Sequence, residues 1–145
     1  MRALIWHVNS FVCRVTEKGR SPLVEPIEER ETRVEEALLV LASVEKTDEH
    51  APQVVAKRGA KMLADHARQL KVNLIVLHSF AHLFAELAAP SVAMDVLKGI
   101  EDQLTTNGYT VKRTPFGWFN ELEIKAKGHP LSRIARVISA SDDKG

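Results

Sequence analysis

The chain has 145 residues, of which 45% are hydrophobic and 27% are charged, and its formal net charge is +1. This length fits one domain with its own core, and no stretch approaches the ~20 apolar residues of a membrane span, so we expect a soluble protein. The near-neutral charge excludes a protein that binds along a long stretch of nucleic-acid backbone, but it permits one that binds a few nucleotides.

The single cysteine and the distribution of charge indicate the cellular compartment and the kind of partner. Cys13 is the only cysteine, so no disulfide can form within the chain, and we expect a buried thiol in a reducing, cytoplasmic compartment. Residues 25–36 carry six glutamates and two arginines, whereas residues 112–136 carry six lysines and arginines and two glutamates. The second segment is therefore better suited to an anionic partner.

The N-terminal part predicts strands and a surface loop. Residues 3–8 and 11–15 are β-branched and aromatic runs separated by the polar pair Asn-Ser at 9–10, which predicts two strands joined by a tight turn. Residues 17–31 contain a glycine, two prolines and many charges, and they predict a loop. Residues 37–44 are almost continuously apolar, which is typical of a strand covered on both faces, and we place this strand centrally in the sheet.

The middle of the chain predicts helices around one more buried strand at residues 72–77. Pro52 suits the first turn of a helix, whose apolar stripe recurs every three or four residues. Residues 78–90 predict a short helix that ends at its final proline, and Ser91 predicts the cap of another helix, which ends at the Asn-Gly pair at 107–108. The inward positions of the two longer helices are Ala56, Ala60, Leu63, Ala67, Leu70, Ala93, Leu97, Ile100 and Leu104.

The C-terminal part predicts a pair of strands and a helix. Residues 109–114 and 120–126 flank the Pro-Phe-Gly turn at 115–117 and predict a last pair of strands, the second with strict alternation. A helix is predicted after Pro130, and residues 139–145 predict a polar linker or tail. The inward positions are Leu122, Ile124 and Ala126 in the strand, and Leu131, Ile134 and Val137 or Ile138 in the helix.

Strands interleaved with helices predict a mixed α/β (α+β) domain in which the helices pack on a sheet. No Walker loop, G-x-G-x-x-G, C-x-x-C or H-E-x-x-H motif is present. His78, His82 and Glu86 recur every fourth residue, but a strand end and a helix start need not share a face, so no metal site is predicted. Ser79 lacks the flanking glycines of a nucleophile turn, which argues against covalent catalysis.

Residues 79–82 lie where a buried strand meets a predicted helix. Ligands of open α/β sheets bind beyond the carboxyl ends of strands, where helix N-termini offer free N–H groups. A binding site at this junction is one interpretation; in the other, Phe80 belongs to the core and His82 only caps the helix. The same two interpretations, binding wall or core aromatics, apply to Trp118 and Phe119.

Five segments stand out when they are taken together: ASVEK at 42–46, FAHL at 80–83, APSVAMDVL at 89–97, PFGW at 115–118 and KGHPL at 127–131. In this order and spacing they resemble the N-terminal editing domain of archaeal threonyl-tRNA synthetases, and the likeness runs over residues 1–138. The resemblance implies the fold of the D-aminoacyl-tRNA deacylases, a homodimer, and hydrolysis of serine wrongly esterified to threonine tRNA. It implies the 3′ end of that tRNA as the partner and no cofactor for this reaction.

Such an activity would meet a physical need. Serine lacks one methyl group of threonine, and a missing group of that size is worth about 1–3 kcal/mol, so a synthesis site alone rejects serine poorly. ATP and zinc would enter only through an attached synthetase catalytic domain. The sequence leaves open whether this domain is joined to such a body or acts in trans.

The resemblance also implies positions for the substrate. The amino acid would lie against the backbone near Val44 and Ala81, and His82 would touch the terminal ribose. Phe80 and Trp118 would complete the walls. The remaining implied contacts are Phe119, Asn120 and Arg133, where the family has tyrosine, lysine and glutamate.

These three departures remove a hydroxyl, a cation and a carboxylate, so none of the three residues can transfer a proton as its counterpart could. Either this chain is impaired, or the family does not depend on side-chain acid–base catalysis, and the ribose 2′-OH activates the water while the backbone binds the oxyanion. We expect an active hydrolase, with His82 and Asn120 nearest the chemistry and Asn120 bonded to the serine hydroxyl. The alternatives are a D-aminoacyl-tRNA deacylase and a non-catalytic binding or dimerisation module.

Overall fold

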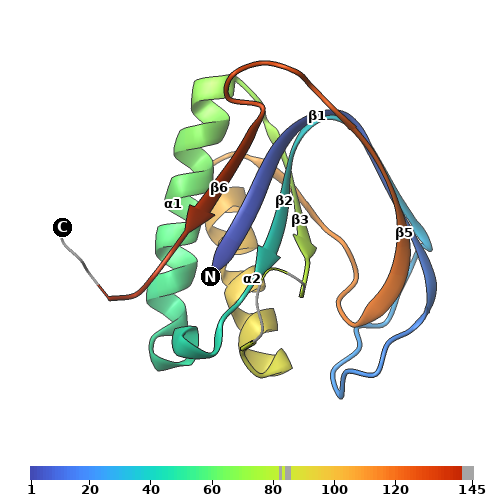
Figure 1. Cartoon of the computed structure of the whole chain (residues 1–145), viewed down its shortest axis with the longest axis vertical. Helices are drawn as coiled ribbons and strands as arrows, with labels where there is room; N and C mark the ends of the chain where they lie inside the picture. Colours follow the sequence, from blue (N-terminus) through green and yellow to red (C-terminus); the bar gives the residue numbers. More distant parts are fainter. Residues whose placement is uncertain (82, 84–85, 142–145) are drawn as a thin grey trace.

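A computed structural model describes residues 1–81, 83 and 86–141. The strands are β1 (Arg2–Lys18), β2 (Glu31–Ser43), β3 (Leu74–Ser79), β4 (Thr110–Arg113), β5 (Trp118–Ala126) and β6 (Arg133–Val137). They form one mixed sheet in the order β4-β3-β2-β1-β5, and β6 also pairs with β1 (Figure 1). β2, β3 and β4 run parallel to one another, whereas β1 is antiparallel to β2, β5 and β6.

β1 is a single strand of 17 residues, so the turn predicted at residues 9–10 is wrong. It pairs with β2 from Arg2 to Arg14, and its register against β5 shifts between Val8 and Ser10. The Asn-Ser pair is therefore accommodated as a bulge, which bends a strand and increases its twist. The sheet curls as a result, and β1 and β5 arch away from the helices (Figure 1).

β2 contains the predicted central strand, and this prediction is confirmed. Every residue from 37 to 44 is buried, because β1 and β3 flank the strand and apolar side chains cover both of its faces. Cys13 lies in the hydrophobic cluster on the concave face, where burial raises the pKa of its thiol to about 11. This is the inert, structural thiol that the sequence predicted.

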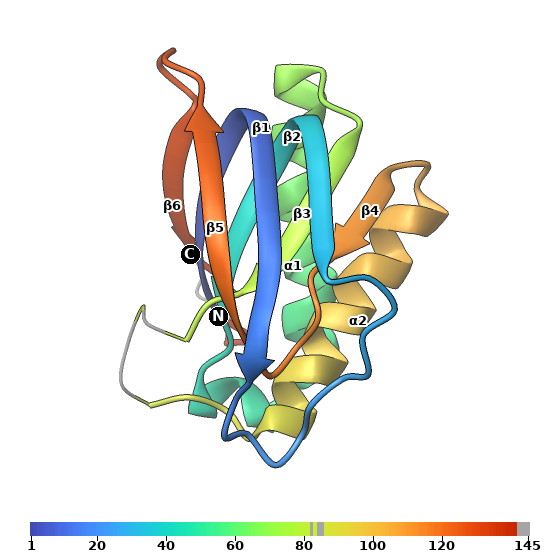
Figure 2. The ribbon, with the colours of Figure 1, turned by 90° about the vertical axis from the view of Figure 1, so that its right-hand side faces the viewer.

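Two α-helices cover the other face of the sheet and pack against each other (Figure 2). They are α1 (Pro52–Leu70) and α2 (Pro90–Thr106), and a short 3₁₀ helix, η1 (Lys46–His50), precedes α1. α1 begins at Pro52 as predicted, whereas α2 begins at Pro90, so Ser91 is not its cap and this proline does not end a helix. Proline suits a first helical residue, because its missing N–H would have no partner there. None of the described helices is both long and apolar enough to cross a membrane.

The short helix predicted for residues 78–90 is absent from the described part of that segment. Its first residues end β3, and Leu87 forms an isolated bridge with Glu45. Ala88 N then donates a hydrogen bond to Val44 O (3.0 Å). The chain therefore runs along the end of β2 before α2 begins, and the backbone groups there find partners without a helix.

β4 and β5 do not pair with each other, contrary to the prediction. β4 pairs with β3 at one side of the sheet, and β5 pairs with β1 at the other. The intervening turn crosses the carboxyl end of β3, where Thr114 N donates to Leu77 O (3.1 Å). The alternation predicted within β5 is confirmed, since Leu122, Ile124 and Ala126 are half-buried between exposed neighbours.

Residues 133–137 form a strand, so the helix predicted after Pro130 is wrong. β5 leaves β1 at Val8, and the first residues of β1 would otherwise present unpaired N–H and C=O groups at a sheet edge. β6 covers that edge, with Arg133 opposite Trp6. The need of β1 for a partner outweighs the helical pattern of this short segment.

Candidate functional site

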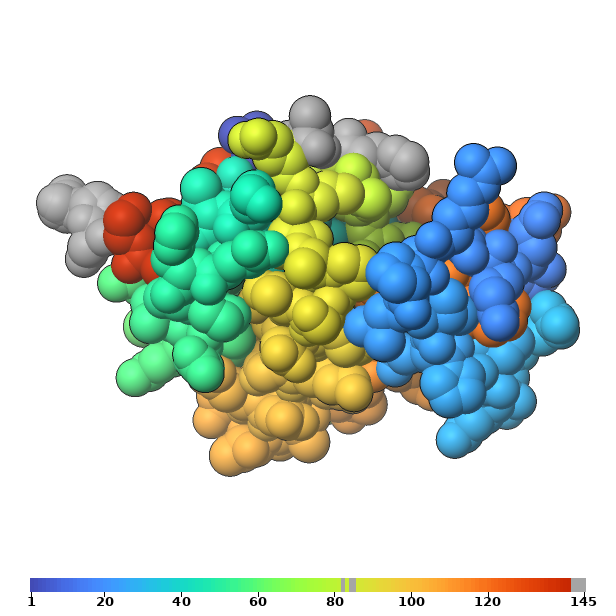
Figure 3. All heavy atoms as spheres, turned by 90° about the horizontal axis from the view of Figure 1, so that it is seen from below, coloured from blue at the N-terminus to red at the C-terminus, as the bar shows by residue number. Residues whose placement is uncertain are grey.

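A cavity of about 570 Å³ opens where β2 and β3 end and β5 begins. Figure 3 looks at this end of the molecule from below, where the loop after β1 (blue) and the start of α2 (yellow) lie on either side of the opening. Segments far apart in the sequence meet here because the sheet curls. Six of the predicted site residues line the cavity: Val44, Phe80, Ala81, Trp118, Phe119 and Asn120.

The backbone that follows β3 forms the floor of the cavity. Phe80 N donates a hydrogen bond to Ala42 O (2.8 Å), and the Ser43 hydroxyl donates one to Phe80 O. These bonds hold the chain against the end of β2, and Val44 and Ala81 lie at the cavity surface. Phe80 also packs against the concave hydrophobic cluster, so this residue contributes to the core and to the lining of the cavity.

β5 forms one wall of the cavity. Trp118 and Asn120 are half-buried, whereas Phe119 between them is 56% exposed, as expected when successive side chains point to opposite faces. Trp118 Nε1 donates to Glu25 O (2.7 Å), and the Asn120 amide donates to Trp118 O (3.3 Å). Trp118 is thus held in place, while the side-chain oxygen of Asn120 accepts no hydrogen bond from the described residues.

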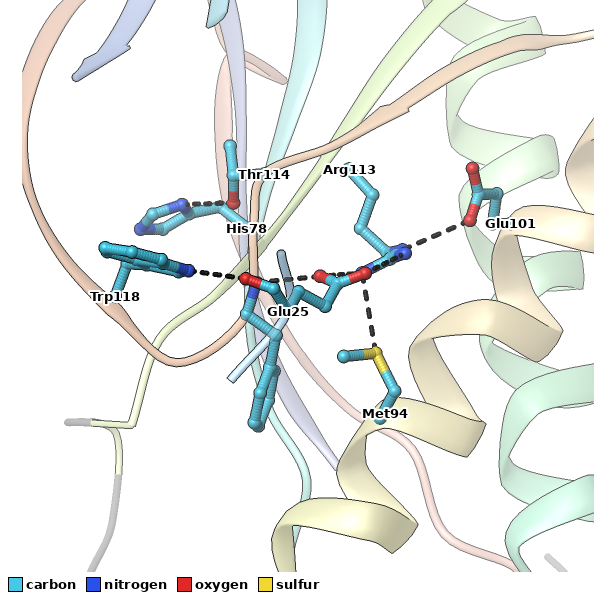
Figure 4. A network of polar contacts seen from close by, with 8 residues as sticks. Glu25, His78, Met94, Glu101, Arg113, Thr114 and Trp118 are labelled. Atoms are coloured by element: carbon cyan, nitrogen blue, oxygen red, sulfur yellow. Dashed lines mark hydrogen bonds and ion pairs between the residues drawn. The ribbon is translucent and has the colours of Figure 1, made fainter. Parts of the chain in front are cut away.

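A charged network anchors this wall from behind (Figure 4). The Glu25 carboxylate accepts two hydrogen bonds from the Arg113 guanidinium (2.7 and 2.8 Å) and one from Phe116 N (2.8 Å). Arg113 also donates to Glu101 (3.1 Å). Burial alone would raise the pKa of the Glu25 carboxyl, but the bonds from Arg113 and Phe116 outweigh burial and lower it. A largely buried ion pair therefore ties the loop after β1 to the end of β4, and the bond from Phe116 ties the same loop to the turn before β5.

Three residues of that loop line the cavity and were missed in the sequence: Gly19, Arg20 and Ser21. Gly19 N donates to Gly117 O (2.8 Å). Gly117 has φ +90°, and a Cβ on it would lie 2.6 Å from Leu23 O, so the close approach of turn and loop requires glycine. The two glycines were visible in the sequence, but nothing in the local pattern shows that they meet.

His78 is a further cavity residue that the sequence did not assign to the site. Its side chain is only 3% exposed, and its Nδ1 lies 2.8 Å from Thr114 Oγ1. Burial lowers the pKa of the imidazole to about 4, so the ring is neutral at neutral pH. Figure 4 shows its second ring nitrogen pointing away from Thr114. The sequence signal that could have assigned His78 to the site is a polar residue near the end of an otherwise apolar strand.

Two predicted site residues are not part of the described cavity. His82, the predicted ribose contact, lies outside the described residues. Arg133 does not line the cavity: it lies opposite Trp6 on β1, whereas Asn120 lies opposite Val15. Nine strand positions span about 30 Å, so within one chain the geometry does not bring Arg133 to the same ligand as Asn120.

The described lining of the cavity is almost free of charge. Arg20 is its only charged side chain, and His78 is neutral. Among the described residues, no three or more His, Cys, Asp or Glu side chains gather closely enough to hold a metal ion. The cavity can therefore bind a small polar ligand through main-chain, hydroxyl and amide groups, while its described part offers no carboxylate to move a proton.

The fold is shared with a protein of known structure. The chain is similar to a solved structure of the c-Myc DNA Unwinding Element Binding Protein, with a TM-score of 0.67 over 94% of this chain and 98% of that one. At 13% sequence identity this likeness shows the fold alone. The chain therefore shares with that protein a mixed α/β fold, and the predicted packing of helices on a sheet is confirmed.

Sequence comparison then identifies the family. The chain belongs to the archaea-specific editing domain family of threonyl-tRNA synthetase, whose family model matches residues 1–138. It is 43% identical over 141 residues to the threonine–tRNA ligase of Thermococcus gammatolerans and 40% identical over 144 residues to that of Methanobrevibacter smithii. These matches cover 95% and 98% of this chain but only 22% and 23% of the two ligases. The chain thus spans less than a quarter of their length, and the predicted family is confirmed.

Proposed function

We propose that this chain is an aminoacyl-tRNA ester hydrolase that removes L-serine wrongly attached to threonine tRNA. The observation that carries the proposal is the cavity itself: a member of an editing-domain family has a pocket of about 570 Å³ at the ends of β2 and β3, and its described lining is nearly uncharged. Sites for small ligands measure roughly 300–1,000 Å³. A cavity of this size suits the aminoacyl ester of one nucleoside.

We place the amino acid between the backbone of Ala81 and the side chain of Asn120. The free side-chain oxygen of Asn120 can accept a hydrogen bond from the serine hydroxyl. Threonine carries one more methyl group, which this part of the cavity has to exclude from a productive position. Trp118, fixed by its bond to Glu25, forms the wall against the nucleoside.

Hydrolysis in this site has to proceed with few side-chain groups. Phe119 has no hydroxyl, and the described lining contains no carboxylate. We therefore assign the activation of water to the ribose 2′-OH next to the ester. The water attacks the ester carbonyl carbon, the bond to the ribose oxygen breaks, and that oxygen leaves with a proton as serine is released. His82 enters this proposal as the ribose contact on family resemblance alone.

The proposed reaction needs only water and ester, so we propose no cofactor for it. ATP and zinc would belong to the remainder of a synthetase. We further propose that the chain acts as a homodimer in the cytoplasm and binds the 3′ end of threonine tRNA. Sedimentation equilibrium at micromolar concentration tests the dimer, and a monomer at all concentrations would contradict it.

The central test is release of serine and threonine from mischarged and correctly charged threonine tRNA. We expect serine to be released at least about tenfold faster than threonine. A 2′-deoxy terminal adenosine should abolish release. Asn120→Ala should slow it by about tenfold, the cost of one hydrogen bond to the substrate. Asn73→Ala is the matched control, because this exposed asparagine lies outside the cavity.

The same assay separates the rival functions. Faster release of D-serine than of L-serine would identify a D-aminoacyl-tRNA deacylase. No release of either enantiomer by folded protein would identify a non-catalytic module, as the changes at Phe119, Asn120 and Arg133 would allow. Full turnover on the 2′-deoxy substrate, together with total loss in Asn120→Ala, would contradict the proposed mechanism while leaving the hydrolase activity intact.

A further inference from the structure

Arg20 is the only cation among the described residues that line the cavity, and nothing described pairs with it. Its side chain is exposed. Two arginines of the sheet, by contrast, have carboxylate partners: Arg14 contacts Glu31 and Glu123, and Arg113 contacts Glu25. A guanidinium carries five hydrogen-bond donors and is always charged. Arg20 therefore has its full binding capacity available beside the cavity.

The backbone that carries Arg20 is held in place on both sides. Gly19 N donates to Gly117 O (2.8 Å), and Glu25 N donates to Phe116 O (3.0 Å). The Glu25 carboxylate is in turn fixed by Arg113. The loop is thus attached to the cavity wall before and after Arg20. These attachments keep the backbone of Arg20 beside the opening of the cavity.

Arg20 lies at the opposite end of the wall from the proposed amino-acid position. The bond between Gly19 and Gly117 places it beside the turn that precedes Trp118, and Asn120 follows on the same face of β5, about 7 Å further along the strand. A bound seryl ester carries an ammonium group, which a guanidinium repels. A substrate with its amino acid at Asn120 and its nucleotide near Arg20 keeps these like charges apart.

The chemistry of the nucleotide then indicates what Arg20 contacts. The terminal adenosine of an aminoacyl-tRNA is neutral in its base and ribose, and its only nearby negative charge is the phosphate on its 5′ side. Guanidinium binds phosphate oxygens through two parallel hydrogen bonds. We infer that Arg20 binds the 5′-phosphate of the terminal nucleotide and so sets the depth to which the ester enters the cavity. This inference rests on the proposed function, because it takes an aminoacyl nucleotide as the ligand.

The test uses two amide analogues that cannot be hydrolysed: 3′-deoxy-3′-(L-seryl)aminoadenosine with and without a 5′-phosphate. Calorimetric titration of the wild-type chain should show that the phosphate tightens Kd by about tenfold, as a charged hydrogen bond does. Arg20→Ala should bind both analogues with the same Kd, within about twofold of the wild-type value for the phosphate-free one. Arg20→Lys should keep part of the gain, because it retains the charge but not the planar fork.

Arg30→Ala is the matched control, since Arg30 lies in the same loop but does not line the cavity. It should keep the whole gain from the phosphate. An undiminished gain in Arg20→Ala would overturn the inference. So would an equal loss of affinity for both analogues, which would place Arg20 against the base or in the support of the loop.

Failure of the inference and failure of the proposed function are distinguishable. If the wild-type chain shows the phosphate gain in binding but releases no serine from the ester, the inference stands and the proposed hydrolysis fails. If it releases serine but gains nothing from the phosphate, the hydrolysis stands and the role of Arg20 fails. If neither analogue binds, the inference fails.

Discussion

The two ends of β5 resemble each other in sequence but differ in what they hold together. Each end has a turn with a glycine, a proline and a ring side chain: Pro-Phe-Gly-Trp before the strand and Lys-Gly-His-Pro after it. The first turn crosses the end of β3 and lines the cavity. The second lies at the far end of β5, where it connects to β6. A strand of nine residues spans about 30 Å, so a small cavity can be lined by only one of them.

The anchors of the two turns differ in exposure. The Arg113 and Glu25 side chains behind the first turn are 13% and 21% exposed. At the second turn, Lys127 Nζ donates to Asn9 Oδ1 (2.6 Å) and to Glu36 Oε1 (2.7 Å), and Glu36 is 66% exposed. Exposed pairs contribute at most about 1 kcal/mol, whereas breaking a buried pair is costly. The comparison indicates that the firmer anchoring is at the end of β5 that lines the cavity.

The largest expected difference concerns the glycine in each turn. Gly117→Ala should lower the free energy of unfolding by about 3 kcal/mol, because its φ is +90° and the new Cβ would lie 2.6 Å from Leu23 O. Gly128→Ala should change it by less than about 0.5 kcal/mol, because nothing lies within 4 Å of its Cβ. Urea denaturation measures both values, and equal losses would contradict the comparison.

The next difference concerns one glutamate at each turn. Glu25→Gln should cost about 2 kcal/mol, because Arg113 is left partly uncompensated behind the wall. Glu36→Gln, the matched control, should cost clearly less than Glu25→Gln, because solvent screens this exposed pair. Because the pKa of Glu25 is lowered from 4.5, its contribution is complete above that pH and is lost as the pH falls through the lowered value. Denaturation at pH 7 and pH 3 checks both; a difference between the two variants that persists at pH 3 would contradict the buried pair as its cause.

Lowering the pH toward 5 should destabilise the wild-type chain more than a His78→Gln variant. The pKa of His78 is about 4 in the folded chain against an ordinary 6.5, so the unfolded chain binds the proton more readily. The stabilising contribution is complete above pH 6.5 and is lost as the pH falls toward 4. Between pH 7 and pH 5 the wild-type chain should lose about 2 kcal/mol more than His78→Gln, which cannot titrate.

Urea denaturation of both proteins at each pH makes this measurement. Other histidines, such as His7, whose pKa is lowered by burial and by the nearby Lys127, titrate in both proteins and cancel in the difference. Equal losses for wild type and variant would show that the imidazole is not held neutral in the folded chain.

The smallest effect is expected at the second turn. Lys127→Met keeps the apolar stem of the side chain and removes its bonds to Asn9 and Glu36. The cost should be below about 1 kcal/mol and should shrink in 1 M salt, where exposed charges are screened within about 3 Å. Thermal unfolding at low and high salt checks it. A large cost that is independent of salt would mean that this turn is held as firmly as the first.

Segments with one dominant local pattern were predictable from the sequence. The continuous apolar run at 37–44, the helix beginning at Pro52 and the alternation in β5 each specify their own structure. Residues 9–10 and 133–137 were predicted wrongly for a common reason. Their conformation is set by the pairing needs of β1, whose partners are distant in the sequence.

The residues of the candidate site likewise fall into those that the sequence predicted and those that it did not. Val44, Ala81 and Asn120 follow from family resemblance, and the structure places all three at one cavity. Arg20 and His78 were missed because their positions depend on how the chain folds back on itself. The ion pair of Glu25 with Arg113, which attaches the loop after β1, joins residues 88 positions apart. No local sequence pattern contains that information.

The long first strand has a consequence for biosynthesis. Residues 2–6 pair with residues 133–137, so this part of β1 is synthesised about 130 residues before its partner. At about 5–20 residues per second, that partner arrives roughly ten seconds later. During this interval the open side of the strand can accept any extended peptide, including the same strand of another nascent copy. The nascent chain is therefore exposed to such pairing until residues 133–137 have been made.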